Sequence, residues 1–320
     1  MSDVREFILD WAGQRRVSDV RRALALADVT PDGAAWIRFA SALTLWLGAV
    51  LLAASVVFFL AFNWDALGRF GKFALVEIVW LAAVVAAARM RVERAPGKAA
   101  LLAAALLTGA LLALIGQTYQ TGADTYELFG VWAAMILPWA LIARFAPLWI
   151  VLLALVNLSV SLYFHAFHGM LGSILGTQSQ FWALAGVNTL ALLVWEWCSR
   201  GGVAWMRERW PARVMVTASG ICMVIVALHA LFEFRGSSAL GIAGYLAWAA
   251  AGYACYRYFV KDLYALAGGV LASIVVVAAF LAKHLRDYGD AGVFLFIGLV
   301  VIGLSAAGAW WLRRVAAEGE

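Results

Sequence analysis

The sequence predicts an all-α integral membrane protein: a polytopic bundle of about ten transmembrane helices that follows a short cytoplasmic helical segment. Of its 320 residues, 65% are hydrophobic and only 13% are charged, whereas a soluble domain is about half apolar and a quarter charged. Apolar runs long enough to cross roughly 30 Å of hydrocarbon recur along the chain. Lysine and arginine gather at alternate ends of these runs, as expected of a membrane protein with a fixed orientation.

Residues 1–35 form the first predicted domain, an N-terminal cytoplasmic helical segment. Phe7, Ile8 and Trp11 fall at helical spacing, and the turn-forming residues 30–33 end the segment. It has no apolar core of the kind found in signal peptides. Because its acidic and basic residues are balanced, it is not a polybasic lipid-binding tail, and a helical hairpin or an interfacial amphipathic helix is expected.

Residues 36–315 form the second predicted domain, which contains the ten transmembrane helices. The expected spans are 38–62, 70–88, 99–116, 126–143, 147–164, 181–198, 212–232, 239–257, 263–282 and 292–312. Five helices precede residue 165 and five follow it, which permits a pair of inverted halves like those of secondary transporters. Small residues four apart, from Ala243 to Cys255, predict a close helix contact.

The basic residues predict the orientation and exclude several partners. Nineteen of the 24 lysines and arginines lie on the side that holds both termini, so both termini are expected in the cytoplasm. These residues sit at helix ends rather than in one patch, so membrane lipids are the expected partners and nucleic acid is not.

Cys198, Cys222 and Cys255 lack metal-binding or redox spacing. We expect no cofactor and no metal site, although His165 and His168 keep a metal site open as an alternative.

The stretch 117–129 is the densest cluster of polar side chains in the chain. Gly116 and Gly122 permit an unwound backbone, so we expect an outward-facing, re-entrant segment that binds substrate. The alternative is an interfacial turn anchored by two tyrosines. The expected binding residues are Gln117, Tyr119, Gln120, Asp124, Tyr126 and Glu127, joined on the same side by Asn63 and Asp65.

Three further polar residues fall inside predicted spans. Glu77 lies near the middle of the second span, where an ionised carboxylate is costly unless it is paired or protonated, so it is a candidate for proton coupling or for a structural hydrogen bond. Asn157 and Asn188 either join neighbouring helices or line a path. Glu196 is expected to pair with Arg200, one helical turn away.

Several motifs of the first half resemble a known family. They are Ile8-Leu-Asp-Trp11, Ala61-Phe-Asn-Trp-Asp65, Ile115-Gly-Gln-Thr-Tyr-Gln120 with Asp124 and Tyr126, and Leu137-Pro-Trp139. Residues 1–145 are thereby similar to an uncharacterised family of bacterial predicted membrane proteins, a domain of unknown function often described beside a membrane protein with a GDYxxLxY-type motif. The resemblance implies a many-helix fold in a bacterial inner membrane and supplies no activity.

Three functions fit these observations. The first is a transporter or flippase-like carrier for a small polar or lipid-linked solute. The second is a non-catalytic subunit or scaffold that binds a second envelope membrane protein. The third is a membrane-embedded transferase or hydrolase that uses Asp124 or Glu127 as acid or base. No catalytic motif accompanies these carboxylates, so an enzyme is the least favoured of the three.

Overall fold

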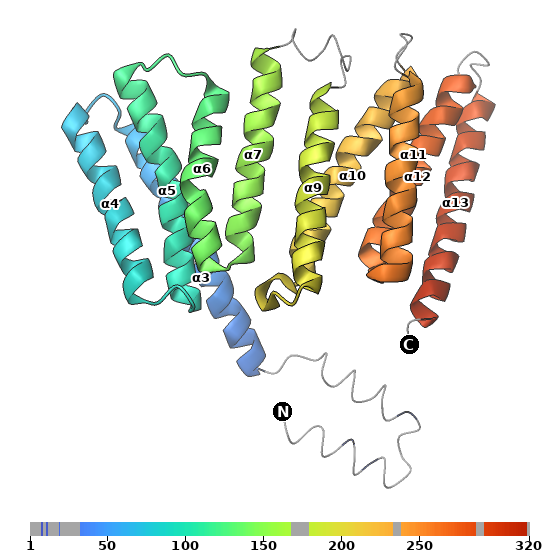
Figure 1. Cartoon of the computed structure of the whole chain (residues 1–320), viewed down its shortest axis with the longest axis horizontal. Helices are drawn as coiled ribbons and strands as arrows, with labels where there is room; N and C mark the ends of the chain where they lie inside the picture. Colours follow the sequence, from blue (N-terminus) through green and yellow to red (C-terminus); the bar gives the residue numbers. More distant parts are fainter. Residues whose placement is uncertain are drawn as a thin grey trace. The chain divides into compact units, whose positions relative to one another are not determined.

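The computed structural model describes residues 33–167, 179–232, 238–285 and 291–318, with the single residues Ile8, Trp11 and Asp19. In these ranges ten long α-helices follow one another and no β-strand occurs, which confirms the predicted all-α bundle (Figure 1). Apart from the three single residues and residues 33–35, which begin the first long helix, the predicted N-terminal helical segment lies outside the described residues, as do His168 and most of the 165–180 connection.

Nine of the observed helices each cover one predicted span, and α11 (Ser238–Ala254) with the turn that follows it covers the span 239–257. The helices are α3 (Gly33–Phe62), α4 (Arg69–Arg89), α5 (Ala95–Tyr119), α6 (Thr125–Ala143), α7 (Ala146–Ala166), α9 (Ser179–Arg200), α10 (Arg209–Phe232), α11 (Ser238–Ala254), α12 (Leu263–His284) and α13 (Ala291–Ala317). Nine of them are long and apolar enough to cross a membrane. The tenth, α11, is shorter but continues as a π-helical turn, η3 (Cys255–Phe259).

The short break between α6 and α7 has a clear local cause. Arg144 adopts a left-handed conformation at φ 48° and ends α6, a common way for a helix to stop. Pro147 then occupies the first turn of α7, where its missing N–H costs nothing. One apolar run is thereby divided into two antiparallel helices.

The chain divides into two compact units, residues 1–118 (unit 1) and 119–320 (unit 2). The core of unit 1 forms where Val56 and Leu60 of α3 meet Val76 of α4 and Leu107 and Leu114 of α5. The α4 and α5 helices are also joined by a hydrogen bond from Trp80 Nε1 to Thr108 Oγ1, at 3.1 Å. The apolar core thus places α5 against both α3 and α4, and the hydrogen bond adds a polar link to α4.

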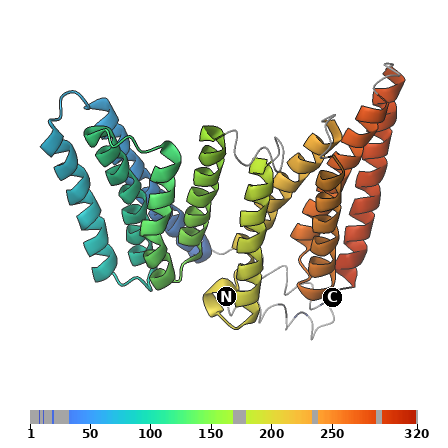
Figure 2. The same ribbon diagram turned by 45° about the horizontal axis from the view of Figure 1, so that its top comes forward.

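In unit 2, α10 is the central helix: it packs against α9, α11 and α12, and it runs obliquely to α9 (Figure 2). Two glycines allow close helix approach, because a Cβ at Gly244 would overlap Trp182 and a Cβ at Gly308 would overlap Val270. The connections α6–α7, α9–α10 and α11–α12 and the end of α13 all lie at the same end of this unit (Figure 1). We call it the basic end, since it carries Arg144, Arg200, Arg207, Arg209, Arg213, Arg257, Lys261, Arg313 and Arg314.

Candidate ligand-binding site

The polar stretch 117–129 is not the re-entrant segment that the sequence suggested. The α5 helix continues through Tyr119 and α6 begins at Thr125, so only five residues connect them. Gln120 at φ 45° and Gly122 at φ 68° turn the chain in left-handed conformations. Because the backbone stays helical on both sides of a five-residue link, the segment is an ordinary tight connection between two helices.

Most side chains of this connection are exposed rather than packed into a core. Tyr119, Gln120, Asp124 and Glu127 are exposed, and Asp124 makes no side-chain capping bond to α6. Tyr126 is the exception. Its backbone carbonyl accepts a 2.8 Å hydrogen bond from Ser159 Oγ, and its ring packs edge-on against Tyr163. Tyr126 therefore anchors α6 to α7, while its hydroxyl donates to the Glu127 carboxylate at 3.3 Å.

Gln117 and the turn that contains Asn63 and Asp65 belong to unit 1. Gln117 and Trp64 line a hollow of about 400 Å³ between α3 and α5. The Asn63 amide donates to the carbonyl of Phe59 at 2.9 Å and so completes its own helix, and Asp65 is exposed. Lys72 Nζ lies 3.6 Å from the centre of the Trp64 ring, a cation–π contact that fixes this turn.

Glu77 lies in the middle of α4 on an exposed face. Its neighbours along that face are Ala74, Ile78 and Leu81, which are exposed too, whereas the preceding residue, Val76, is fully buried. Within the described residues no hydrogen-bond or ion-pair partner reaches the Glu77 carboxylate. A carboxylate at membrane depth is unfavourable by a few kcal/mol, about 2.5 or more, so this face requires a polar partner or a bound proton.

Asn157 and Asn188 bridge α7 and α9 through reciprocal amide hydrogen bonds of 3.2 and 2.5 Å. Each amide also donates to the carbonyl four residues earlier in its own helix. Asn188 is only 1% exposed. These bonds satisfy both side chains and give them a structural role as a link between two helices.

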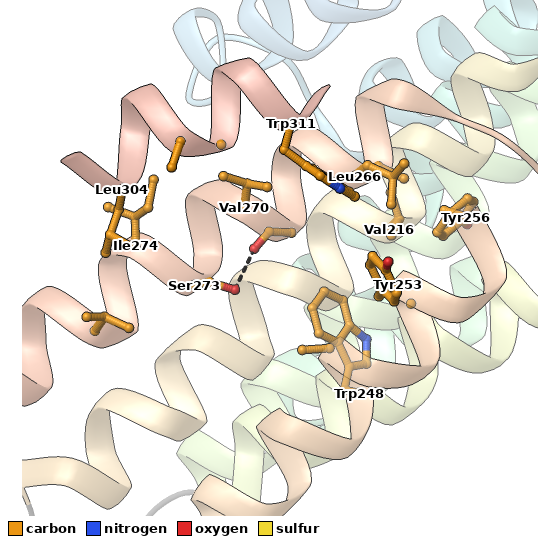
Figure 3. Close-up of a pocket in the computed structure, with 17 residues that line it drawn as sticks. Val216, Trp248, Tyr253, Tyr256, Leu266, Val270, Ser273, Ile274, Leu304 and Trp311 are labelled. Carbon is orange, nitrogen blue, oxygen red and sulfur yellow. Dashed lines mark hydrogen bonds between the residues drawn. The ribbon is translucent and has the colours of Figure 1, made fainter. Parts of the chain in front are cut away.

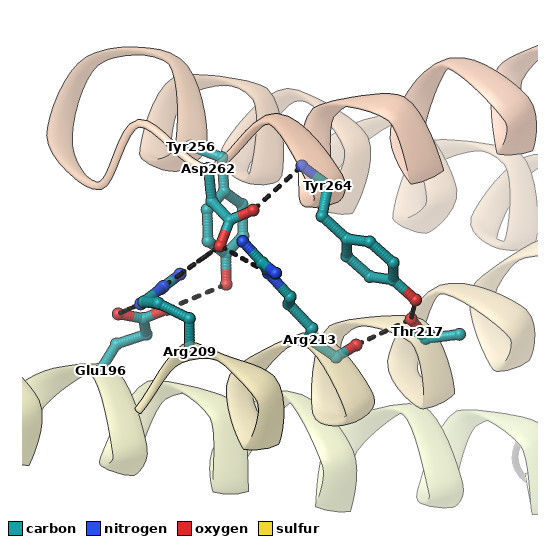
Figure 4. A network of polar contacts seen from close by, with 7 residues as sticks. All are labelled: Glu196, Arg209, Arg213, Thr217, Tyr256, Asp262 and Tyr264. Atoms are coloured by element: carbon teal, nitrogen blue, oxygen red, sulfur yellow. Dashed lines mark hydrogen bonds and ion pairs between the residues drawn. The ribbon is translucent and has the colours of Figure 1, made fainter. Parts of the chain in front are cut away.

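The charged residues that do come together lie at the basic end of unit 2. Arg209, at the start of α10, donates from Nη1 to both carboxylate oxygens of Glu196 at 3.0 Å, so Arg200 is not the partner of Glu196. The same guanidinium reaches Asp262 Oδ2 at 3.1 Å, and Arg213 Nε donates to that oxygen at 3.2 Å (Figure 4). These residues, with Tyr256, Thr217 and Tyr264, form what we call the ion-pair network.

Asp262 holds the network to the start of α12. It is 4% exposed, and its Oδ1 accepts the backbone N–H of Tyr264 at 3.0 Å, which caps the helix. Burial opposes ionisation of this carboxyl, but hydrogen bonds from Arg213 and Arg209 outweigh it and hold the pKa of Asp262 below its ordinary value. Asp262 is therefore ionised at neutral pH, and one carboxylate joins the ends of α10 and α12.

Three apolar hollows open beside this network. The α11–α13 hollow encloses about 380 Å³ (Figure 3), the α10–α12 hollow about 490 Å³, and the α9–α11 hollow about 560 Å³. Each volume falls in the range of small-molecule sites, about 300–1,000 Å³. Val216 and Trp248 line all three hollows.

The Trp248 side chain lies where the three hollows adjoin, because it lines each of them. Its indole N–H donates to Ser219 Oγ at 2.9 Å, and Ser219 is fully buried and also bonded to Thr189. Gly252 lines two of these hollows together with Trp248, and an added Cβ at Gly252 would meet no atom within 4 Å. The indole is thus held rigidly, and open space remains beside it.

Each hollow ends at a member of the ion-pair network. Tyr256 lines the α11–α13 and α9–α11 hollows, and its hydroxyl donates to Glu196 at 3.3 Å. Thr217 and Tyr264 line the α10–α12 hollow and bond to one another at 3.0 Å. The site is therefore amphiphilic: apolar cavities in the middle of the bundle end at charged and hydroxyl groups.

Sequence reasoning missed these hollows, although one signal pointed to their position. The small residues Ala243, Ala247 and Ala251 were expected to lie in a helix contact, but they are exposed on unit 2. Ala251 and Cys255 line the α9–α11 hollow instead. Their small size leaves room on that face of α11 where larger side chains would have filled it.

The fold and these cavities define a polytopic α-helical membrane protein with an amphiphilic site. Residues 9–149 match the model of a family described as predicted membrane protein (DUF2157), which confirms the family resemblance for that part of the chain. The match covers α3 to α6 and the first turn of α7, so α9 to α13 and their hollows lie beyond it. No curated protein and no solved structure matches the chain.

Proposed function

We propose that unit 2 binds an amphiphilic ligand and that the protein is a carrier for a lipid-linked or similar solute. One observation supports this above all: three apolar hollows of ligand size end at one network of charged and hydroxyl side chains. Hydrocarbon chains fit apolar walls, and a polar head placed at the network would find hydrogen-bond donors and acceptors there.

The position of the network agrees with this proposal. It lies at the basic end of unit 2, where the arginines that set the orientation also gather, so in a cytoplasm-facing arrangement it would sit at the depth of the lipid headgroups. The paired charges of Glu196, Arg209 and Asp262 also tie three helices together there. Movement of a ligand past this point would require those ion pairs to rearrange.

The test is a lipid-movement assay in vesicles. Purified protein is reconstituted with a lipid whose headgroup carries a fluorophore, and a membrane-impermeant quencher reports the fraction in the outer leaflet over time. The proposal predicts quenching that exceeds half of the signal at a rate proportional to protein content. A rate equal to that of protein-free vesicles would contradict the carrier function.

Glu77 supports a second candidate function, that of a subunit that binds a partner. Its carboxylate lies near the middle of α4, an apolar helix long enough to cross a membrane, on an exposed face. Charge complementarity favours a transmembrane helix that carries a hydrogen-bond donor or a cation. The control variant is Ala74→Ser, a mild polar change on the same face. Affinity purification from native membranes should yield a partner that Glu77→Gln loses and Ala74→Ser keeps. A wild-type chain that purifies alone in mild detergent would refute this function.

A further inference from the structure

A fourth hollow of unit 2 lies at the basic end, against the last turn of α13. It encloses about 360 Å³ and is lined by Tyr256, Arg257, Lys261, Leu263, Leu266, Val315, Ala316 and Glu318. We call it the C-terminal hollow. Its lining differs from that of the other three, because two cations and one carboxylate face it.

The two cations are supplied by an irregular stretch of backbone. Arg257 lies in the π-helical turn η3, and π-turns often occur at functional sites. Lys261 follows in the link to α12 with a left-handed φ of 54°, a conformation that is unfavourable for a residue with a side chain. Lys261 is exposed, and no carboxylate of the described residues pairs with it. The Lys261 ammonium, which has no carboxylate partner among the described residues, and the Arg257 guanidinium therefore line the same hollow.

Glu318 is the anion that now occupies this place. Its carboxylate pairs with Arg257 across the hollow and with Arg314 Nε at 3.3 Å. The hydrogen bond from Arg257 is the main reason that the pKa of Glu318 lies below its ordinary value. A carboxylate and a phosphate offer similar acceptor oxygens to a guanidinium. The position of Glu318 therefore marks where an anionic group can bind.

The C-terminal hollow adjoins the α11–α13 hollow, since Tyr256 and Leu266 line both. Beyond these two residues the walls become apolar, with Tyr253 and Trp311 packed at a ring separation of 5.9 Å. An anion site that adjoins an apolar cavity suits a ligand with a charged head and a hydrocarbon chain.

We propose that the C-terminal hollow binds the phosphate of an anionic lipid between Arg257 and Lys261, while the acyl chain extends into the α11–α13 hollow and Glu318 is displaced. This inference rests on the proposed function, because it names the headgroup of the amphiphile that unit 2 binds. Glu318 is a competing internal anion. Its removal should strengthen lipid binding, and loss of Lys261 should weaken it.

The test measures binding of dioctanoyl phosphatidic acid to the full chain in detergent by calorimetry. The comparison ligands are dioctanoylglycerol, which lacks the phosphate, and inorganic phosphate, which lacks the chains. Lys261→Gln should weaken binding of the phosphatidic acid about tenfold, the loss of one hydrogen bond between charged groups, and Glu318→Gln should strengthen it about threefold to tenfold. The matched control is Arg207→Gln, which removes an exposed cation of the basic end outside the hollow and should leave the affinity unchanged.

The three ligands separate the possible failures. If dioctanoylglycerol binds as tightly as the phosphatidic acid, and Lys261→Gln changes neither affinity, the phosphate site is overturned while the proposed function stands. If neither lipid binds, the proposed function itself fails. Inorganic phosphate that binds as tightly as the phosphatidic acid would overturn the part played by the acyl chain and leave a site for a free anion.

Discussion

The substitution Gly252→Leu tests the hollows directly. Gly252 lines both the α11–α13 and the α9–α11 hollows, and a Cβ at this position would meet no atom within 4 Å. A leucine side chain can therefore enter the open space without strain on its neighbours. It also replaces a helical glycine, which by itself favours the helix by about 0.5–1 kcal/mol. The variant should fold at least as well as the wild type.

The effect on ligand binding follows from the atoms displaced. A leucine side chain adds four carbons and excludes about as many carbons of an acyl chain. If each of those carbons makes about five wall contacts at about 0.1 kcal/mol per contact, the gross loss is about 2 kcal/mol. The displaced part of the acyl chain regains about half of this contact energy from the bilayer or the detergent. The net loss is therefore about 1 kcal/mol, or roughly a fivefold weaker affinity.

The assay is mass spectrometry of the lipids that stay bound after purification in mild detergent. Gly186→Leu is the matched control, because Gly186 is also a helical glycine with no atom within 4 Å of a Cβ, but it lines none of the hollows of unit 2. Gly252→Leu should lower the bound lipid per protein severalfold, and Gly186→Leu should leave it unchanged. Equal retention by both variants would refute the assignment of the hollows as the binding site.

Three further predictions concern the stability of unit 2 and are measured by thermal or denaturant unfolding in detergent. Because the pKa of Asp262 is lowered in the folded chain, its stabilisation is complete above the ordinary carboxyl pKa of about 3.9 and is lost as the pH falls through the folded value. Asp262→Asn keeps the helix cap, so it should lower the free energy of unfolding by about 1.5–3 kcal/mol near pH 7 and by progressively less as the pH falls below about 4; a cost independent of pH would contradict the ion-pair role. Gly308→Ala should destabilise the α12–α13 contact by about 1–3 kcal/mol, since the new Cβ would lie 2.5 Å from Val270 Cγ1. The control Gly303→Ala adds a Cβ that meets no atom within 4 Å and should not lower the stability. An equal loss of stability in both variants would argue against the close approach at Gly308. The double variant Asn157→Leu/Asn188→Leu should lose less free energy of unfolding than the two single variants lose in sum, by a coupling energy of about 0.6–1.7 kcal/mol. Strictly additive losses would mean that the amide pair does not bridge α7 and α9.

The helices could be predicted because their signal is local. An apolar run of about 20 residues must satisfy its backbone within itself in a membrane, so each span could be identified without knowledge of its neighbours. The separate spans 126–143 and 147–164 could be predicted for the same reason, since a proline at a helix start acts over only a few residues, whereas the left-handed conformation of Arg144 is known only from the structure.

The site could be predicted only in part, because it depends on contacts between distant elements. Glu196 and Arg200 are four apart and suggested a pair, yet Glu196 pairs with Arg209 from the start of α10 and accepts a hydrogen bond from Tyr256. Arg209 in turn reaches Asp262 at the start of α12. Polar density alone marked the 117–129 stretch, and polar density does not distinguish a binding loop from a tight connection. The hollows are formed by small side chains on several helices, which a single sequence does not bring together.

The most direct test of the central claim is a cryo-electron-microscopy map of the protein in lipid nanodiscs. The account predicts elongated density in the hollows on either side of the Trp248 indole, with its polar end next to Tyr256 or Tyr264. Hollows that are filled by other parts of the chain, or that hold no such density at a resolution where neighbouring side chains are clear, would contradict it.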